Sequence, residues 1–221
     1  LKSNVNLHLH FGAELLGSTD LDSYHKVFPE LKGKESPALI FARGVANIAI
    51  TGSGTINGQG AHQNFQHGND SKGGPRRPKI IYFIGCNNVR VQDVTLRNSA
   101  YWTQDYEKCN GVIVRGVKVY SHANWNNDGL DIDSRNVVVS DCYIDCDDDA
   151  LCLKSDTDTP CENVTVTNCV LKSNCNAIKF GTSSYSGFKN VTISNCTIDR
   201  ASEDHIRQWY KNYPWIGTKH K

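Results

Sequence analysis

The sequence predicts a parallel β-helix, an all-β solenoid in which each coil of the chain stacks on the preceding coil. The first observation is a recurring phrase of alternating β-branched and polar residues, a pattern typical of β-strands. The phrase occurs at residues 46–56, 87–96, 110–119, 135–144, 162–171 and 189–198. The second observation is its spacing: aligned copies lie 41, 23, 25, 27 and 27 residues apart, and a repeat of about 20–30 residues suits one coil.

Further strands are expected within each coil. Shorter alternating segments follow three of the phrases, at residues 128–133, 149–154 and 176–181, and glycine and asparagine mark the corners between strands. Residues 200–221 abandon the repeat. We therefore divide the chain into a β-helix over residues 1–199 and a divergent tail over 200–221. The aromatic residues of the tail are expected to cover the open end of the helix, with a poorly ordered terminus as the equal alternative.

Two residue types recur at fixed positions of the repeat. The corner position is expected to carry a ladder of stacked side chains that hydrogen-bond from coil to coil. It holds Asn47, Asn88, Gly111, Asn136, Asn163 and Asn190. Six of the nine cysteines also fall in two columns: Cys142, Cys169 and Cys196, and Cys86, Cys109 and Cys161. We interpret the first column as free, inward-facing thiols that act as small apolar groups, with disulfides as the alternative.

The composition limits the possible partners. Lys and Arg number 24 and Asp and Glu number 23, so a net charge of +1 gives no overall field for nucleic acid or an anionic membrane. No apolar run reaches the ~18–20 residues of a membrane span, and residues 1–15 lack the regions of a signal peptide. The chain begins without Met and already in a strand-like pattern, which suggests that the sequence starts within a longer protein. Any charge chemistry should be local.

An acidic run is the candidate site. Residues 145–154 read DCDDDALCLK. When the second strands are aligned, Asp128, Asp149 and Asn176 occupy one position in three consecutive coils, and Asp148 lies next to Asp149. Because neighbouring strands are about 4.8 Å apart, we expect these carboxylates to be close in space.

Like charges gathered at a solenoid corner repel each other, so the arrangement needs a chemical reason. Carboxylates can bind a hard cation such as calcium. They can also hydrolyse glycosides, with one carboxyl group protonated as general acid while others activate water. Turn capping is the structural alternative, and it is as good an explanation as function for Asp131 and Asp147.

The sequence also resembles a known family, over roughly residues 1–199. Residues 3–24 resemble the first coil of glycoside hydrolase family 28, GSGTINGQG (52–60) its glycine-rich turn, and residues 75–103 the stretch before its catalytic coils. NND at 126–128 and DDA at 148–150 resemble the family's acidic motifs. The resemblance implies a right-handed, pectin-lyase-like parallel β-helix of the polygalacturonase and rhamnogalacturonase type. It also implies inverting hydrolysis by three aspartates, with carboxyl groups ~6.5–9.5 Å apart.

Site residues follow from the resemblance position by position. Asp148 would be the general acid, and Asp128 and Asp149 would activate the water. Where the family has a Gly-His-Gly segment, this chain has Cys175, Asn176 and Ala177, so Asn176 would replace the family histidine.

Substrate contacts are expected from other residues near the acids. The family's Arg-Ile-Lys motif is replaced by HIRQWY at 205–210, which leaves Arg207 as the basic residue for a uronate carboxylate. Lys154 and Lys179 could substitute for the motif, although lone lysines on strands often only face solvent. Asn126 precedes the acid of its motif, and Trp125 could stack on a sugar ring. Trp102 could do the same or pack in the core.

The resulting functional expectation is a secreted or periplasmic, monomeric glycoside hydrolase that acts on pectic or related polysaccharides without a cofactor or a metal. The compartment rests on the resemblance alone. Two alternatives stay open. One is a polysaccharide lyase of the same architecture, in which the aspartates bind calcium and a base removes a proton. The other is a catalytically impaired, carbohydrate-binding solenoid.

Overall fold

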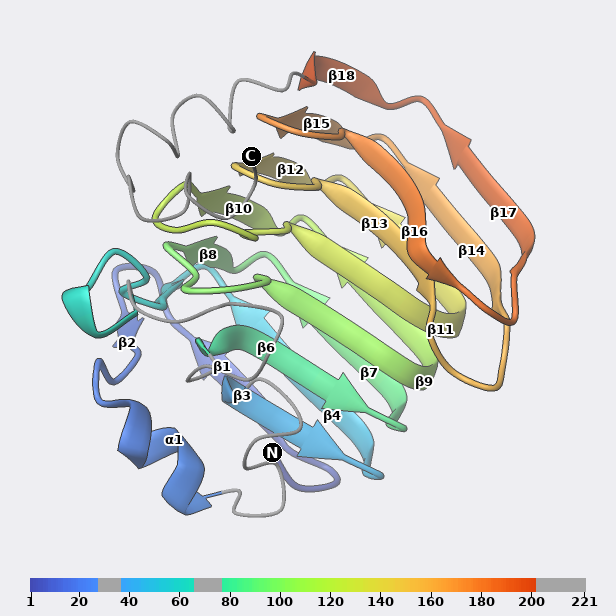
Figure 1. Cartoon of the computed structure of the whole chain (residues 1–221). Helices are drawn as coiled ribbons and strands as arrows, with labels where there is room; N and C mark the ends of the chain where they lie inside the picture. The colour runs from blue at the N-terminus through green and yellow to red at the C-terminus, as the bar shows by residue number, and fades with distance from the viewer. Residues whose placement is uncertain (28–36, 66–76, 202–221) are drawn as a thin grey trace.

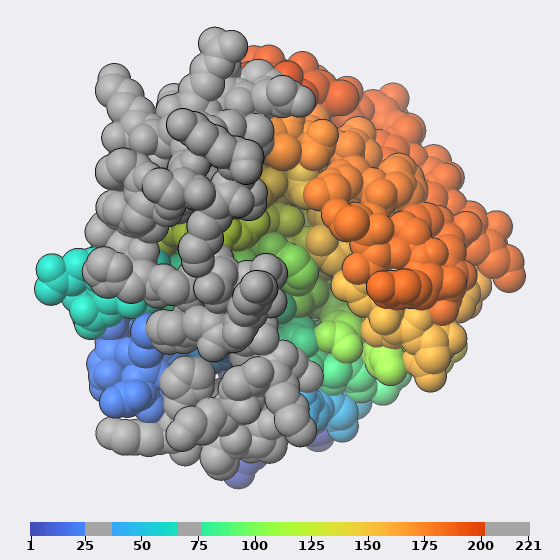
Figure 2. Space-filling view, viewed as in Figure 1, coloured from blue at the N-terminus to red at the C-terminus, as the bar shows by residue number. Residues whose placement is uncertain are grey.

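A computed structural model describes residues 1–27, 37–65 and 77–201 of the chain. It confirms the predicted parallel β-helix: the strands pair in parallel with the equivalent strands of the neighbouring coils (Figure 1). The coils follow chain order from the N-terminal to the C-terminal end of the solenoid (Figure 2). Nearly the whole tail, including Arg207 and the aromatic residues expected to cover the open end, lies outside the described residues.

Each coil contributes strands to three faces of the solenoid. The first and second faces belong to one 11-stranded sheet and the third to a 7-stranded sheet. The first face contains β3 (Ala38–Arg43), β6 (Lys79–Ile84), the first parts of β9 (Gln104–Arg115) and β11 (Leu130–Ser140), β13 (Leu151–Ser155) and β16 (Ile178–Ser184). The second contains β1 (Asn6–Leu9), β4 (Ala46–Gly52), β7 (Asn87–Gln92), the remaining parts of β9 and β11, β14 (Cys161–Thr167) and β17 (Phe188–Ser194). The third contains β2 (Glu14–Leu16), β5 (Thr55–Asn57), β8 (Thr95–Arg97), β10 (Lys118–Ser121), β12 (Tyr143–Cys146), β15 (Val170–Ser173) and β18 (Thr197–Ala201).

Helical structure is minor among the described residues. Helix α1 (Leu21–Val27) begins after Asp20, whose carboxylate accepts hydrogen bonds from the Asp22 amide (3.0 Å) and the Ser23 hydroxyl (2.7 Å) as an N-cap. A short 3-10 turn, η2, spans Gln63–Phe65. Neither of them is long and apolar enough to cross a membrane.

The strand register matches the alignment of the repeat. Asn87 pairs with Asn110, and Arg135 pairs with Asn110 on one side and Glu162 on the other. Each of these residues directly precedes a corner residue, so the corner residues stack as the sequence predicts. Fixing this register also fixes which side chains of distant coils become neighbours.

The corner asparagines adopt a backbone conformation that few residues tolerate. Their φ angles are positive, between 52° and 58°, and Gly111 at the equivalent position has a φ of 74°. Asparagine and glycine enter this left-handed region at the lowest energy, which explains why they occupy the corner.

Side-chain amides connect these corners, as predicted. Asn136 Nδ2 donates to Asn110 Oδ1 (2.7 Å), and Asn163 Nδ2 donates to Asn136 Oδ1 (3.0 Å). Asn190 continues the ladder onto Asn163 (2.9 Å). Gly111 has no side chain to offer, and Asn110 takes over the ladder at that coil.

The interior of the solenoid is an apolar column. Val, Ile and Leu from the strands of all three faces fill it, and each strand turns alternate residues inward. The predicted cysteine column is confirmed: Cys142 and Cys169 are buried one above the other, and Cys196 is partly buried in the last described coil. All nine cysteines are free thiols.

The ladder predicts a difference between two substitutions of one residue. Asn136→Ala removes two hydrogen bonds and replaces asparagine, whose polar side chain helps it adopt the left-handed region, with a residue that adopts this region at a higher energy. The free energy of unfolding should therefore fall by about 2–3 kcal/mol. Asn136→Gly removes the same bonds but tolerates the backbone angle, so its loss should be about 1 kcal/mol smaller. Denaturant titration of both variants measures the difference, and a glycine variant at least as unstable as the alanine variant would contradict this explanation.

Candidate active site

Two consecutive coils bring the acidic residues to one corner at the start of the first face, and the next coil adds Asn176. The amide of Gly129, the residue after Asp128, donates to the carbonyl of Asp149 (2.8 Å), and the amide of Ala150 donates to the carbonyl of Asn176 (2.9 Å). The structure thus places Asp128, Asp149 and Asn176 at equivalent positions of successive coils.

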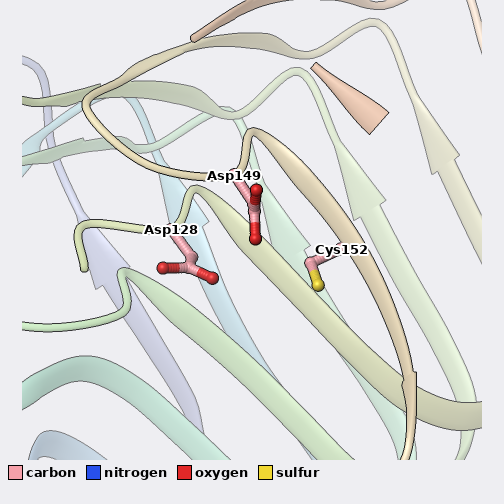
Figure 3. A group of neighbouring side chains, drawn as sticks. All are labelled: Asp128, Asp149 and Cys152. Atoms are coloured by element: carbon pink, nitrogen blue, oxygen red, sulfur yellow. The ribbon is translucent and has the colours of Figure 1, made fainter. Parts of the chain in front are cut away.

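The carboxylates come close because the coils approach tightly at this corner. Asp128, Asp149 and Cys152 each have one oxygen or sulfur atom within 4.8 Å of the others, and their side chains point toward one another (Figure 3). At Gly129, a Cβ atom would lie only 2.8 Å from the carbonyl oxygen of Ala150, so this position excludes a side chain. Asp148 lies at the same corner: one of its oxygens is within 4.8 Å of an Asp149 oxygen and of the Cys175 sulfur. The nearest oxygen atoms of Asp149 and of each of the other two acids are thus closer together than the ~6.5–9.5 Å expected from the sequence between carboxyl groups of an inverting site.

Asp149 is held by two donors from the next coil. Asn176 Nδ2 donates to its Oδ1 (2.6 Å), and the Lys179 ammonium lies 2.7 Å from its Oδ2. The Asp149 side chain is 2% exposed, whereas that of Lys179 is 31% exposed. The charged ammonium and the neutral amide each bind a different oxygen of this buried carboxylate, so they fix its direction. Asn176 therefore contacts an acidic residue of the preceding coil, and Lys179 is not merely a solvated strand residue.

Asp148 is the most accessible of the three acids. Its residue is 9% exposed, compared with 3% for Asp128 and 1% for Asp149. Its Oδ2 accepts a hydrogen bond from Asn126 Nδ2 (3.2 Å), and its Oδ1 accepts one from the Asp149 backbone amide (3.0 Å). Asp148 is therefore both fixed in place and reachable from the surface.

Asp128 is buried with an oxygen that lacks a partner. Its Oδ1 has no hydrogen-bond partner in the described part of the chain. Burial raises the pKa of Asp128 well above 3.8, and the nearby carboxylates of Asp131, Asp148 and Asp149 add to this, with Lys154 acting in the opposite direction. Asp128 therefore holds a proton more readily than an ordinary aspartate and has a free site for a small hydrogen-bonding group.

A buried arginine organises the loop before Asp128. Arg77 is 1% exposed, and its Nη1 donates to the Asn124 side chain (2.8 Å) and the Trp125 carbonyl (2.6 Å). Its Nη2 donates to Asn126 Oδ1 (3.2 Å), whose amide group in turn contacts Asp148. The planar, forked guanidinium suits such a multidentate arrangement. Arg77 thereby links β6 to the loop that carries the acidic motif.

Two buried ion pairs continue the charged region along the first face. Lys79 pairs with Asp105, and Lys154 lies 3.2 Å from Asp131. Both ammonium groups face the Trp102 ring, at 4.5 Å and 4.4 Å from its centroid. The ring also stacks on Tyr101. Trp102 is thus largely engaged by protein groups.

Several sequence predictions change at this site. Asp131 lies inside β11 and not at a turn, which removes turn capping as its explanation. Lys154 is 10% exposed at its side chain, so it is neither a solvated strand residue nor freely available to substrate. The Trp125 ring is contacted by the Arg77 guanidinium (4.4 Å).

Three further charged residues of this region were not predicted from the sequence: Arg77, Lys79 and Asp105. The run PRRPK at 75–79 was the available signal for the two basic residues, because a basic cluster just before a strand of the catalytic coils has no role in the apolar core. Asp105 had a weaker signal: it occupies the position of Asp131 one coil earlier, where the two residues pair in register.

Comparison with known proteins gives matches in both sequence and fold. The family model for glycosyl hydrolases family 28 matches residues 14–209. A probable polygalacturonase of Vitis vinifera is 32% identical over 171 residues, which cover 72% of this chain and 34% of that protein. An exopolygalacturonase from Thermotoga maritima has a TM-score of 0.73 and 25% identity, and the match covers 89% of this chain and 55% of that one. The family 28 exopolygalacturonase of Yersinia enterocolitica gives the same TM-score and identity over 44% of its chain. This chain therefore spans about a third to a half of the length of these relatives.

The arginine contacts predict a selective loss of stability. Arg77→Met removes three hydrogen bonds that a buried guanidinium donates to the 124–126 loop, so the free energy of unfolding should fall by about 2–4 kcal/mol. Arg77→Lys should recover only part of this loss, because one ammonium cannot reproduce the fork. Arg43→Met, at an exposed arginine on the same face, is the matched control and should change stability by less than about 1 kcal/mol. Equal effects at both positions, measured by denaturant titration, would contradict the proposed role of Arg77.

Proposed function

We propose that this chain, which belongs to family 28 of the glycosyl hydrolases, hydrolyses glycosidic bonds of a pectic polysaccharide by inversion at the anomeric carbon. The observation that carries the proposal is the convergence of Asp128, Asp148 and Asp149 from successive coils at one corner, with different surroundings for each carboxyl group. Glycoside hydrolysis requires such a division between carboxyl groups in different environments. The names of the similar proteins, polygalacturonases of plants and bacteria, support a galacturonate-containing substrate.

In this proposal Asp148 is the general acid. It is the most exposed of the three, and a group that protonates the oxygen of the leaving sugar must reach the substrate. Its hydrogen bonds from Asn126 and from the Asp149 amide fix the direction of its carboxyl group. A fixed direction matters because proton transfer requires a heavy-atom separation of about 2.6–3.2 Å.

Asp128 and Asp149 activate the attacking water. Asp128 offers the oxygen that lacks a protein partner, and a water molecule bound there would lie within reach of Asp149. Asn176 and Lys179 hold the Asp149 carboxylate in place during the reaction. Attack by this water on the face opposite the leaving group gives the inverted product.

Lys179 is the best-placed described cation for a substrate carboxylate. Lys79 and Lys154 are nearly buried in ion pairs, whereas Lys179 is about one-third exposed beside the catalytic acids. A uronate that approaches Asp148 would meet this ammonium group, and Asn126 and Trp125 would line the neighbouring surface. Arg207 remains a candidate for the same role outside the described residues.

The proposal extends to location and assembly. A polysaccharide substrate of this kind is reached outside the cell, as is general for family 28, and one solenoid carries all three acids without a second chain. We therefore propose an extracellular, monomeric enzyme.

The first test removes the general acid. Asp148→Asn should lower the release of reducing ends from polygalacturonate by a factor of about 10²–10⁴ and leave the circular dichroism spectrum unchanged. Proton NMR of the wild-type reaction should show the inverted anomer as the first product. Full activity in the variant, or an unsaturated, ultraviolet-absorbing product that indicates a lyase, would overturn the proposal. Asp199→Asn, at an exposed carboxylate near the end of the solenoid, is the matched control and should retain activity.

The second test follows the protonation of Asp128. Only the ionised carboxylate can accept a proton from water, so kcat/KM should fall as the pH drops through the raised pKa of Asp128, at a pH well above 3.8. Asp131→Asn removes a neighbouring negative charge that raises this pKa, so the acidic limb should move to lower pH. A limb that does not move, or activity that falls as the pH rises through the same range, would show that Asp128 is not the base.

A further inference from the structure

The proposed mechanism does not use Cys152, although its thiol faces two of the acids. Cys152 is fully buried on β13, and its sulfur lies within 4.8 Å of oxygen atoms of Asp128 and Asp149 (Figure 3). Its thiol donates to the Gly181 carbonyl (2.9 Å). Packing as small apolar groups explains the cysteines of the two columns. Cys152 belongs to neither column, so this explanation does not apply to it. Its position in register with Asp131 and Lys179 places it among charged residues of the first face.

An independent feature indicates that a ligand belongs here. Asp128 is only 3% exposed, and its Oδ1 has no hydrogen-bond partner among the described residues. A buried carboxylate oxygen without a donor is costly, and a bound cation would satisfy it. The thiol and the Asp149 carboxylate converge on the same space.

We infer that Asp128, Asp149 and Cys152 form a binding site for a thiophilic divalent cation of the zinc type. Zinc takes four ligands, drawn from sulfur, nitrogen and carboxylate oxygen, at ~2.0–2.3 Å. Tetrahedral ligands at these distances are roughly 3.3–3.8 Å apart, so donors within 4.8 Å need to move by only about an ångström to close the site. The fourth position is left for water.

The donor set favours zinc over calcium. Calcium requires six to eight oxygen ligands, as a rule, and this group offers two carboxylates and a sulfur. The charges also balance: the dication and the Lys179 ammonium together match two carboxylates and one thiolate. Binding converts the thiol to the thiolate, with the proton released to solvent.

A second group of donors provides an internal comparison. Asp148, Asp149 and Cys175 also have one donor atom each within 4.8 Å of the others. Cys175 is only partly buried, and Asp148 already accepts two hydrogen bonds. Neither Asp148 oxygen is among the buried side-chain atoms that lack a partner, so the observation that supports the first group does not apply to the second.

Bound zinc would inhibit the enzyme. This consequence rests on the proposed function, because the cation would occupy the oxygen atoms of Asp128 and Asp149 that activate water. The binding itself does not depend on that function. The two claims can therefore be measured separately.

Binding is tested by titrating the whole chain with Zn²⁺ in a calorimeter and with Co²⁺ in a spectrophotometer. The wild type and Cys175→Ser should bind one Zn²⁺ per chain and show a thiolate-to-cobalt absorption band. Cys152→Ser should bind at least tenfold more weakly and lose the band, since loss of an outer-shell contact alone costs 10–100-fold. Circular dichroism verifies that each variant is folded. Loss of binding in Cys175→Ser but not in Cys152→Ser, or no binding by the wild type, overturns the site.

The inhibition is tested on the same proteins with polygalacturonate. Zinc should lower the activity of the wild type and of Cys175→Ser. In Cys152→Ser, the zinc concentration that halves the activity should be at least tenfold higher. Binding without inhibition in an active enzyme would overturn the placement of the cation on the water-activating acids. An inactive wild-type chain would count against the proposed function, and the calorimetric and cobalt results would still decide the zinc site.

Discussion

The register between successive coils is the constraint on which the rest of this structure depends. Parallel β-strands bring equivalent residues of neighbouring coils to within about 4.8 Å, whatever the number of residues between them. The left-handed corners hold this register, because asparagine or glycine at each corner accepts the required φ angle. The asparagine side chains then connect each corner to the next. A slip by one residue would turn inward-facing side chains outward along a whole coil.

The same register gathers charge that the fold alone would avoid. Asp128, Asp148 and Asp149 lie at one corner, and Asp105 and Asp131 are paired neighbours on adjacent strands. Cations compensate for part of this charge from the outer face, since Lys79 and Lys154 pair with two of these carboxylates and Lys179 pairs with a third. Asp128 remains without such a partner. Burial and the neighbouring carboxylates raise the pKa of Asp128, so the ionisation of this acid sets the low-pH limit expected for a group that activates water.

The sequence predicted the architecture well because the repeat carries the information locally. Each copy of the repeat contains both the alternating pattern of a strand and the residue of the corner. Aligning the copies was therefore sufficient to predict the parallel pairing, the asparagine ladder and the free thiols. It also predicted the shared position of Asp128, Asp149 and Asn176. The partners of these acids could not be predicted in the same way. Arg77 binds a loop about 50 positions further along the chain. The repeat pattern does not predict contacts between side chains that come from different loops. Lys154 was difficult for a related reason: its burial depends on Trp102 and Asp131, which come from two other coils.

The most direct test of the account is a crystal structure of Asp148→Asn with a galacturonate oligosaccharide bound, since the loss of the acid should preserve the substrate. A glycosidic oxygen should lie beside residue 148, and an ordered water should lie between the carboxyl groups of Asp128 and Asp149, on the opposite face of the sugar. An oligosaccharide bound on another face of the solenoid, or the three side chains directed to separate surfaces, would contradict it.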